Sequence, residues 1–348
     1  MSVGATKAGL LERLEQGSVI CAEGYVFEFE RRGYLQAGAF VPEVVLENPD
    51  LVAQLHREFV HAGSDVVEAF TYYAHREKLQ TIGKEQLLEP INRQALAIAK
   101  EVADETGALL AGDICNTNVY VSGDPESVVR HMFEEQVRWA VEAGVDYIVG
   151  ETFTWGEEAL LALDVIKATG LPAVVTMTIH REGTTGEGWA PEEACKRLED
   201  AGADVVGLNC SRGPRTMLPL LVEIRAAVTG RVAALPVPYR TTDAEPSFQS
   251  LTDPACDLIP DGRAFPTALD PFVCNRYELE DFARKAHALG VDYLGVCCGA
   301  GPHHIRAVAE GLGRTPPASR YSPDMSKHAF LGTHDRIPEE YKEYAERL

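Results

Sequence analysis

Eight short runs rich in β-branched and other apolar residues recur along the chain, and most are separated by segments long enough to form a helix. Parallel strands need such crossover segments, so the alternation predicts a repeating βα unit. Eight units favour a (β/α)8 TIM barrel, with an open doubly wound sheet as the alternative, because counting strands does not prove closure. The runs are Ser18–Cys21, Ser64–Phe70, Ala108–Ile114, Asp146–Thr152, Pro172–Thr178, Asp204–Cys210, Val232–Val237 and Asp292–Cys298.

A four-residue phrase marks the expected joints between helix and strand. In each copy a glycine can end a helix in a left-handed turn, and the residues after the aspartate are apolar. The Asn48-Pro49 and Asp124-Pro125 pairs predict helix starts, with Gly63 ending the helix that begins at Pro49. The copies read Ala62-Gly-Ser-Asp65, Ala143-Gly-Val-Asp146, Ala201-Gly-Ala-Asp204 and Leu289-Gly-Val-Asp292.

The repeating pattern predicts one barrel domain over residues 1–314 and a short appendage over residues 315–348. Within the barrel, Thr241–Pro271 is rich in Pro, Asp and Thr and is too long for a bare turn, so we expect a long loop over the barrel mouth. The appendage ends in a polar, helix-like segment. It is either an arm for a partner subunit or a strap on its own barrel, so a homo-oligomer is one of two alternatives.

The net charge of the chain argues against some classes of binding partner. The 348 residues include 32 Lys plus Arg against 53 Asp plus Glu, a net charge of −21, which argues against nucleic acid and anionic membranes. No apolar run approaches the roughly 20 residues that span a bilayer, and the amino terminus has acidic residues where a signal peptide would need an apolar stretch. We therefore expect a cytoplasmic protein whose cysteines are thiols, metal ligands or nucleophiles rather than disulfides.

Three cysteines fall at the carboxyl ends of predicted strands, where TIM barrels place their reacting groups. Cys210 ends the sixth run and the pair Cys297-Cys298 ends the eighth. Gly299 and Gly301 allow the chain to leave the strand, so that both members of the pair can face one site. Three thiolates suit Zn²⁺ and leave a fourth position open, as in catalytic zinc sites. A buried cysteine is more often a small hydrophobe, and this interpretation holds for Cys21, Cys115, Cys195, Cys256 and Cys274.

The segments around these cysteines resemble a known family. Gly207-Leu-Asn-Cys210 and Gly295-Val-Cys-Cys-Gly-Ala-Gly-Pro-His-His-Ile-Arg306 are similar to the paired motifs of zinc-dependent homocysteine S-methyltransferases, especially the betaine-using members. The likeness includes Val26–Tyr34, His56–Phe59 and Phe70–Leu79, and extends from about Leu11 to Ala318. It implies a (β/α)8 barrel, Zn²⁺ held by Cys210, Cys297 and Cys298, and methyl transfer from betaine or a similar onium donor to homocysteine, giving methionine and dimethylglycine.

The resemblance also assigns substrate-binding residues. Phe40, Tyr72 and Tyr73 lie in segments similar to the family's donor site, and aromatic faces suit a methylated ammonium. Phe40 stands where betaine enzymes usually have tryptophan, and packing at the barrel rim is the alternative role of the two tyrosines. Glu151 corresponds to a family glutamate that holds the acceptor's amino group. The alternative is that Glu151 is a solvated carboxylate in a loop, with no contact to a substrate.

The chain departs from the family at two positions. Betaine enzymes usually have Asp-Gly-Gly after the first strand, and the aspartate binds the acceptor's amino group, but this chain has Ala22 there. Glu23, one residue on, is the nearest carboxylate that can replace it. Thr152 replaces a family tyrosine, which leaves open whether a protein oxygen or water is the fourth zinc ligand. Further polar residues near strand ends are compatible with another substrate, namely Glu68, Asp113, Asn116 and Asn118.

Three alternative functions remain at this point. The donor can be S-methylmethionine, a dimethylsulfonio acid or another methylated amine, with the same fold and metal. The acceptor can be a thiol other than homocysteine. A non-catalytic zinc or thiol-redox protein would explain the cysteines, but it leaves the aromatic and acidic residues at the other strand ends without a role.

Overall fold

The computed structural model describes residues 7–122 and 126–348, so the predicted helix start at Asp124-Pro125 lies outside the described residues. Eight parallel strands form one sheet in the order β1-β8-β7-β6-β5-β4-β3-β2. The seam between β1 and β2 is bridged by a hydrogen bond from Asp65 N to Ile20 O at 2.8 Å. The TIM barrel is therefore confirmed over the open sheet. The strands are β1 (Val19–Ala22), β2 (Val66–Glu68), β3 (Leu109–Cys115), β4 (Tyr147–Phe153), β5 (Ala173–Met177), β6 (Val205–Asn209), β7 (Arg231–Leu235) and β8 (Tyr293–Val296).

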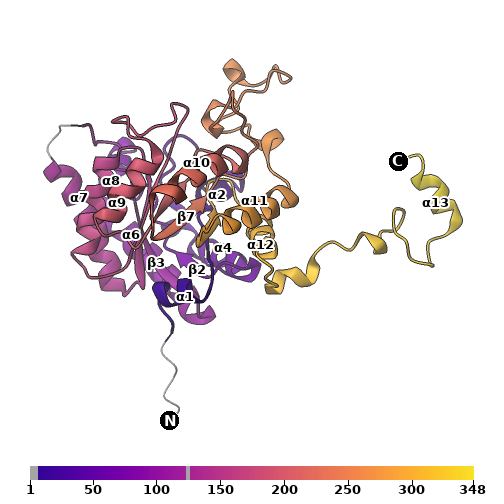
Figure 1. Ribbon diagram of the computed structural model, residues 1–348, viewed down its shortest axis with the longest axis horizontal. Helices are drawn as coiled ribbons and strands as arrows, with labels where there is room; N and C mark the ends of the chain where they lie inside the picture. Colours follow the sequence, from indigo (N-terminus) through magenta and orange to yellow (C-terminus); the bar gives the residue numbers. More distant parts are fainter. Residues whose placement is uncertain (1–6, 123–125) are drawn as a thin grey trace, which may run out of the picture.

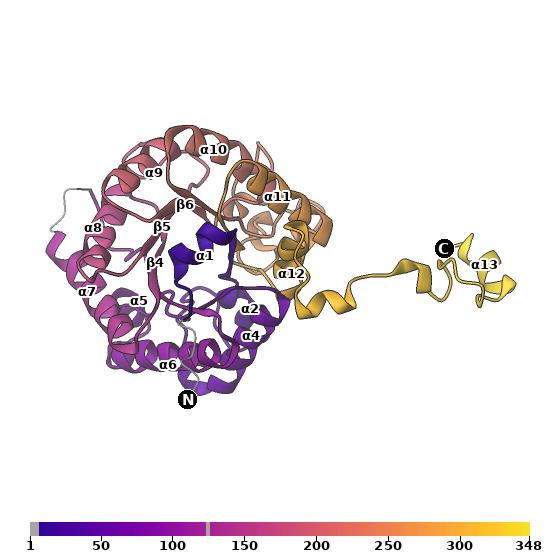
Figure 2. The same ribbon diagram turned by 60° about the horizontal axis from the view of Figure 1, so that its bottom comes forward.

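Helices form a ring around these strands, and α1 lies in front of the barrel at the end where the strands begin (Figure 2). The strands are buried on both faces, as expected when helices cover a parallel sheet. The helices are α1 (Leu10–Gln16), α2 (Tyr25–Arg31), α3 (Val44–Glu47), α4 (Pro49–Ala62), α5 (Arg76–Thr81), α6 (Leu88–Thr106), α7 (Glu126–Ala143), α8 (Gly156–Lys167), α9 (Pro191–Asp200), α10 (Pro214–Ala227), α11 (Arg276–Ala288) and α12 (Pro302–Gly311).

The repeated glycine–aspartate phrase forms the joint that leads into every second strand. Its glycines all have positive φ, with values of 118°, 77°, 97° and 83° at Gly63, Gly144, Gly202 and Gly290. The aspartate then pairs with the preceding strand. Before β6, for example, Asp204 N donates to Ala173 O at 2.9 Å, and Ala173 N donates to the Asp204 carboxylate at 2.8 Å. The phrase thus forms the predicted turn into the strand, and its aspartate also sets the strand register.

The long loop after β7 covers part of the carboxyl-terminal end of the barrel, as expected. Phe248 in this loop is buried, its backbone N donates to Ser211 O at 2.8 Å, and its ring stacks on Tyr239. Ser211 Oγ also donates to the Gln249 side chain at 3.0 Å. The outer part of the loop projects above the barrel in Figure 1. The loop is therefore anchored directly beside Cys210.

Residues beyond the barrel run away from it. The short 3₁₀ helix η5 (Pro317–Tyr321) packs on α4 and α12, whereas α13 (Glu339–Ala345) lies far from the barrel (Figures 1 and 2). The segment after Tyr321 is not a strap across its own barrel. The division at residue 314 stays a prediction. Among residues 7–122 and 126–348, no helix has the length and apolar character needed to cross a membrane.

Candidate active site

Three cysteine thiols meet at the carboxyl ends of β6 and β8. The sulfur atoms of Cys210, Cys297 and Cys298 all lie within 4.8 Å of one another, and all three residues are buried. Sulfurs that bind one zinc ion tetrahedrally at about 2.3 Å lie about 3.8 Å apart. The arrangement of these soft donors therefore fits Zn²⁺, and the structure brings together the three cysteines that the sequence singled out.

Local backbone geometry turns these cysteines toward one another. Cys210 has a φ of 55°, in the left-handed region that non-glycine residues rarely adopt. Cys210 N and Cys297 N donate to the carbonyls of Leu235 and Pro236, each at 2.9 Å, so the end of β7 holds both cysteine segments. After Cys298 the chain leaves the strand at Gly299, whose φ is 91°. A Cβ there would lie 2.2 Å from the Tyr239 hydroxyl, so only glycine fits this turn.

The pKa values of the three thiols are shifted in different directions. Hydrogen bonds from the neighbouring thiols hold the pKa of Cys210 well below its usual range. Burial raises the pKa of Cys297, and the hydrogen bond to Cys210 raises that of Cys298. A divalent cation bound by all three sulfurs would stabilise them as thiolates.

Four buried carboxylates lie next to the thiols, and we call them the acidic well: Glu23, Glu68, Asp113 and Glu151. They come from the ends of four consecutive strands, β1 to β4, and each is at most 5% exposed. They line a cavity of about 10 Å³ together with Tyr72 and both cysteines of the vicinal pair. The sequence predicted Glu23 and Glu151 here and noted Glu68 and Asp113 only as polar residues, so the structure adds two carboxylates to the site.

The electrostatics of the well favour a cation. Burial raises the pKa of Glu151 to about 8, and it also raises the pKa of Glu23, Glu68 and Asp113 well above the usual range. Repulsion between the carboxylates adds to this effect. In the described part of the chain, no lysine, arginine or histidine forms an ion pair or hydrogen bond with any of the four; their partners are thiol, hydroxyl and amide groups. A positively charged ligand would relieve the repulsion.

Asn209 connects the acidic well to the thiols, and the sequence analysis assigned it no role. Its amide nitrogen donates to Glu151 Oε2 at 2.5 Å and to Glu23 Oε2 at 3.3 Å, and lies 3.8 Å from Cys297 Sγ. Its oxygen accepts from Thr152 N at 2.9 Å and from Thr176 Oγ1 at 3.0 Å. The sequence feature that could have identified Asn209 is its position immediately before Cys210, at the end of a buried strand.

The predicted aromatic residues divide into two groups. Tyr72 lines the acidic cavity, and its ring centroid lies 4.2 Å from that of Tyr73. Lys78 Nζ lies 4.0 Å from the centroid of the Tyr73 ring. Phe40 packs instead on Phe27, with ring centroids 5.6 Å apart, in a cluster that also includes Phe248 and Phe265. Only the tyrosine pair is thus placed beside the cysteines by these contacts.

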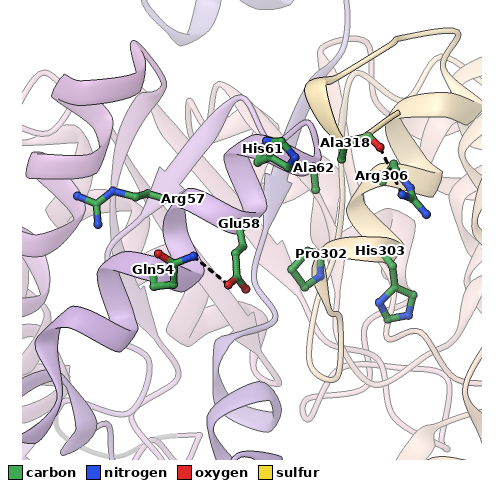
Figure 3. A pocket seen from close by; sticks show the side chains of 9 residues that line it. All are labelled: Gln54, Arg57, Glu58, His61, Ala62, Pro302, His303, Arg306 and Ala318. Atoms are coloured by element: carbon green, nitrogen blue, oxygen red, sulfur yellow. Dashed lines mark hydrogen bonds between the residues drawn. The ribbon is translucent and has the colours of Figure 1, made fainter. Parts of the chain in front are cut away.

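A larger groove lies away from this site, on the outside of the barrel between α4 and α12 (Figure 3). It measures about 530 Å³. Gln54 donates to Glu58 at 3.1 Å on one side, and Arg306 donates to Ala318 O at 3.4 Å on the other. The groove contains none of the site residues predicted from the sequence, so its size alone does not mark the active site.

Comparisons with known proteins identify the family of the chain. The homocysteine S-methyltransferase family model matches residues 22–312. Betaine–homocysteine S-methyltransferase 1 of Danio rerio is 39% identical over 340 residues, which cover 96% of this chain and 82% of that protein. The Mus musculus enzyme of the same name is 39% identical over 341 residues, covering 94% and 80%. S-methylmethionine–homocysteine S-methyltransferase of Pongo abelii is 37% identical over 338 residues, covering 94% and 87%.

A solved structure shares the fold. The Escherichia coli homocysteine methyltransferase in its metallated form superimposes with a TM-score of 0.66 at 16% identity, covering 86% of this chain and 98% of that one. The family match over most of the barrel confirms the resemblance seen in the cysteine motifs. The chain is a methyltransferase and belongs to the homocysteine S-methyltransferase family.

Proposed function

We propose that this enzyme transfers a methyl group from betaine to the thiol of homocysteine. The thiolate attacks a methyl carbon, the new S–CH₃ bond forms as the N–CH₃ bond breaks, and the electron pair stays on nitrogen. The products are methionine and dimethylglycine. The observation that carries this proposal is that the acidic well, Tyr72 and the Cys297-Cys298 pair line one cavity, with the Cys210 sulfur within 4.8 Å of both sulfurs of the pair.

Cys210, Cys297 and Cys298 would hold the zinc ion, whose chemistry is to keep a fourth sulfur ligand deprotonated yet nucleophilic near neutral pH. Support comes from the mutual distances of the three sulfurs and from the absence of disulfides among the described cysteines. The Escherichia coli homocysteine methyltransferase that shares this fold has been solved in a metallated form.

The acceptor's amino group would lie against Glu151 and Glu23. Asn209 binds one oxygen of each carboxylate, which fixes their orientation while adding no charge. The second oxygen of Glu23, Oε1, is buried without a hydrogen-bond partner in the structure, so it is free to accept from a ligand. An oxygen of each carboxylate also lies within 4.8 Å of the Cys297 sulfur. An amine bound here would therefore bring the acceptor's sulfur close to the thiols.

The methyl donor would lie against aromatic rings. The π face of Tyr72 would attract a quaternary ammonium, and Tyr73 lies beside it with ring centroids 4.2 Å apart. Lys78 Nζ lies over the Tyr73 ring and Phe40 packs on Phe27, so Tyr72 is the principal donor contact. The leaving amine departs uncharged, so no general acid is required. What these side chains supply is orientation of the methyl carbon toward the acceptor's sulfur.

S-methylmethionine is the second candidate donor, because a relative with 37% identity carries that donor in its name and because Phe40 replaces the usual tryptophan. Initial rates with a panel of donors at fixed homocysteine separate the two. We expect betaine to give the highest kcat/KM. A higher kcat/KM with S-methylmethionine or a dimethylsulfonio acid would assign that donor class instead, and no methyl transfer to homocysteine from any donor would reject the acceptor.

A further inference from the structure

The acidic well contains more carboxylates than the proposed amine contact uses. Oxygens of Glu23 and Glu151 lie within 4.8 Å of the Cys297 sulfur, whereas oxygens of Glu68 and Asp113 lie within 4.8 Å of each other and of a Glu151 oxygen. Both are buried on strand ends that face the cavity. The proposed contacts with Glu23 and Glu151 leave these two groups unexplained.

Two of the four carboxylates in the well have one oxygen without a hydrogen-bond partner. Asp113 Oδ2 accepts from the Thr71 hydroxyl at 3.4 Å, while Asp113 Oδ1 is buried and has no hydrogen-bond partner in the structure. Glu23 Oε1 is also buried and has no hydrogen-bond partner in the structure. Buried polar atoms are nearly always satisfied in folded proteins, so a pair of free oxygens on one small cavity points to a ligand that donates hydrogen bonds.

The spacing of the inner carboxylates fits an ammonium group. Three oxygens that accept the three N–H groups of an ammonium at about 2.8 Å lie about 4.6 Å apart. Glu68, Asp113 and Glu151 offer three oxygens that lie within 4.8 Å of one another. A cavity of about 10 Å³ has room for roughly one water-sized group, which suits a primary ammonium and is too small for a trimethylammonium.

We propose that Asp113 and Glu68 are specificity-determining residues that bind, with Glu151 and Glu23, the primary ammonium of the methyl acceptor and exclude the quaternary donor from the well. This inference rests on the proposed function and extends it, because it limits the acceptors to thiols that carry a free primary amine. The donor's onium group must then remain at the tyrosines.

Calorimetric titration of the zinc-loaded protein tests this without any methyl transfer. Homocysteine is compared with 4-mercaptobutanoic acid, which has the same thiol and carboxylate but lacks the amine. In the unmodified protein we expect homocysteine to bind at least tenfold more tightly. Asp113→Asn and Glu68→Gln should each weaken homocysteine binding by roughly tenfold or more and leave the binding of 4-mercaptobutanoic acid unchanged.

Glu158→Gln is the matched control, because Glu158 is a buried carboxylate outside the well that accepts from Thr117 N and Oγ1. It should change neither affinity. Equal binding of the two thiols to the unmodified protein, or equal losses for both thiols in Asp113→Asn, would overturn the inference. Amine-dependent binding in a protein that cannot use betaine would instead support the inference while rejecting the proposed donor.

Discussion

Cys298→Ala is expected to abolish zinc binding at stoichiometric metal and to lower kcat/KM for methyl transfer by more than about 100-fold. Changes in residues that only support a metal ligand already cost roughly 10- to 100-fold, and this change removes one of three sulfurs directly. The remaining pair, Cys210 and Cys297, would leave two open positions on the ion. Metal analysis after gel filtration, together with steady-state rates, measures both effects.

Cys195→Ala provides the control for this experiment. Cys195 is also a buried free thiol, but it lies on α9 and points its sulfur at Gly207 O, 3.7 Å away. Its replacement should leave one zinc per chain and nearly full activity. Thermal unfolding of both variants checks that the barrel is intact. Full zinc occupancy in folded Cys298→Ala would show that the metal, if any, is held elsewhere.

Glu151→Gln should raise the KM for homocysteine by roughly tenfold to 100-fold. A hydrogen bond to a charged group contributes about 1.5–3 kcal/mol. Glu151 is the carboxylate whose oxygens lie within 4.8 Å both of Glu23 and Cys297 and of Glu68 and Asp113. The KM for betaine should stay within about twofold, because the donor contacts the tyrosines. Steady-state kinetics with each substrate varied in turn separates the two parameters.

Glu23→Gln is expected to act in the same direction, because Glu23 Oε1 is a buried acceptor without a partner and an oxygen of Glu23 lies within 4.8 Å of a Glu151 oxygen. The Asn209 contact to the second oxygen can persist in the glutamine variant, so the backbone at Ala22 should not shift. Unaltered homocysteine kinetics in Glu23→Gln would mean that the loss of the family aspartate at Ala22 has not been compensated there. The amine would then depend on Glu151 with Asp113 and Glu68.

The barrel could be predicted because its signals are local. The phrase at Gly202 and Asp204 contains both the turn and the residue that pairs with the preceding strand, so four adjacent residues determine one joint. The vicinal pair Cys297-Cys298 was similarly visible, since Gly299 beside it permits the required turn. To predict that Cys210 lies close to this pair, only one further rule was needed, namely that parallel strands end at the same face of a barrel.

The acidic well could not be predicted as a unit, because it depends on distances between four strands. Glu68 and Asp113 are 45 residues apart in the sequence, and nothing near either residue shows that one Asp113 oxygen lacks a partner. Asn209 was equally hidden: its neighbours in sequence are Leu208 and Cys210, whereas its hydrogen bonds go to β4, β5 and the end of β1. Phe40 shows the reverse case, since its family position suggested a donor contact while its ring packs on Phe27.

X-ray absorption at the zinc edge tests most directly whether the three cysteines activate the acceptor's thiol. The protein is loaded with one zinc per chain and measured alone and with saturating homocysteine. We predict three sulfur neighbours at about 2.3 Å in the free enzyme and four with the acceptor bound, since the thiol would take the open position. A shell of four sulfurs before homocysteine is added, or three sulfurs that do not change with saturating homocysteine, would contradict thiol activation by this site.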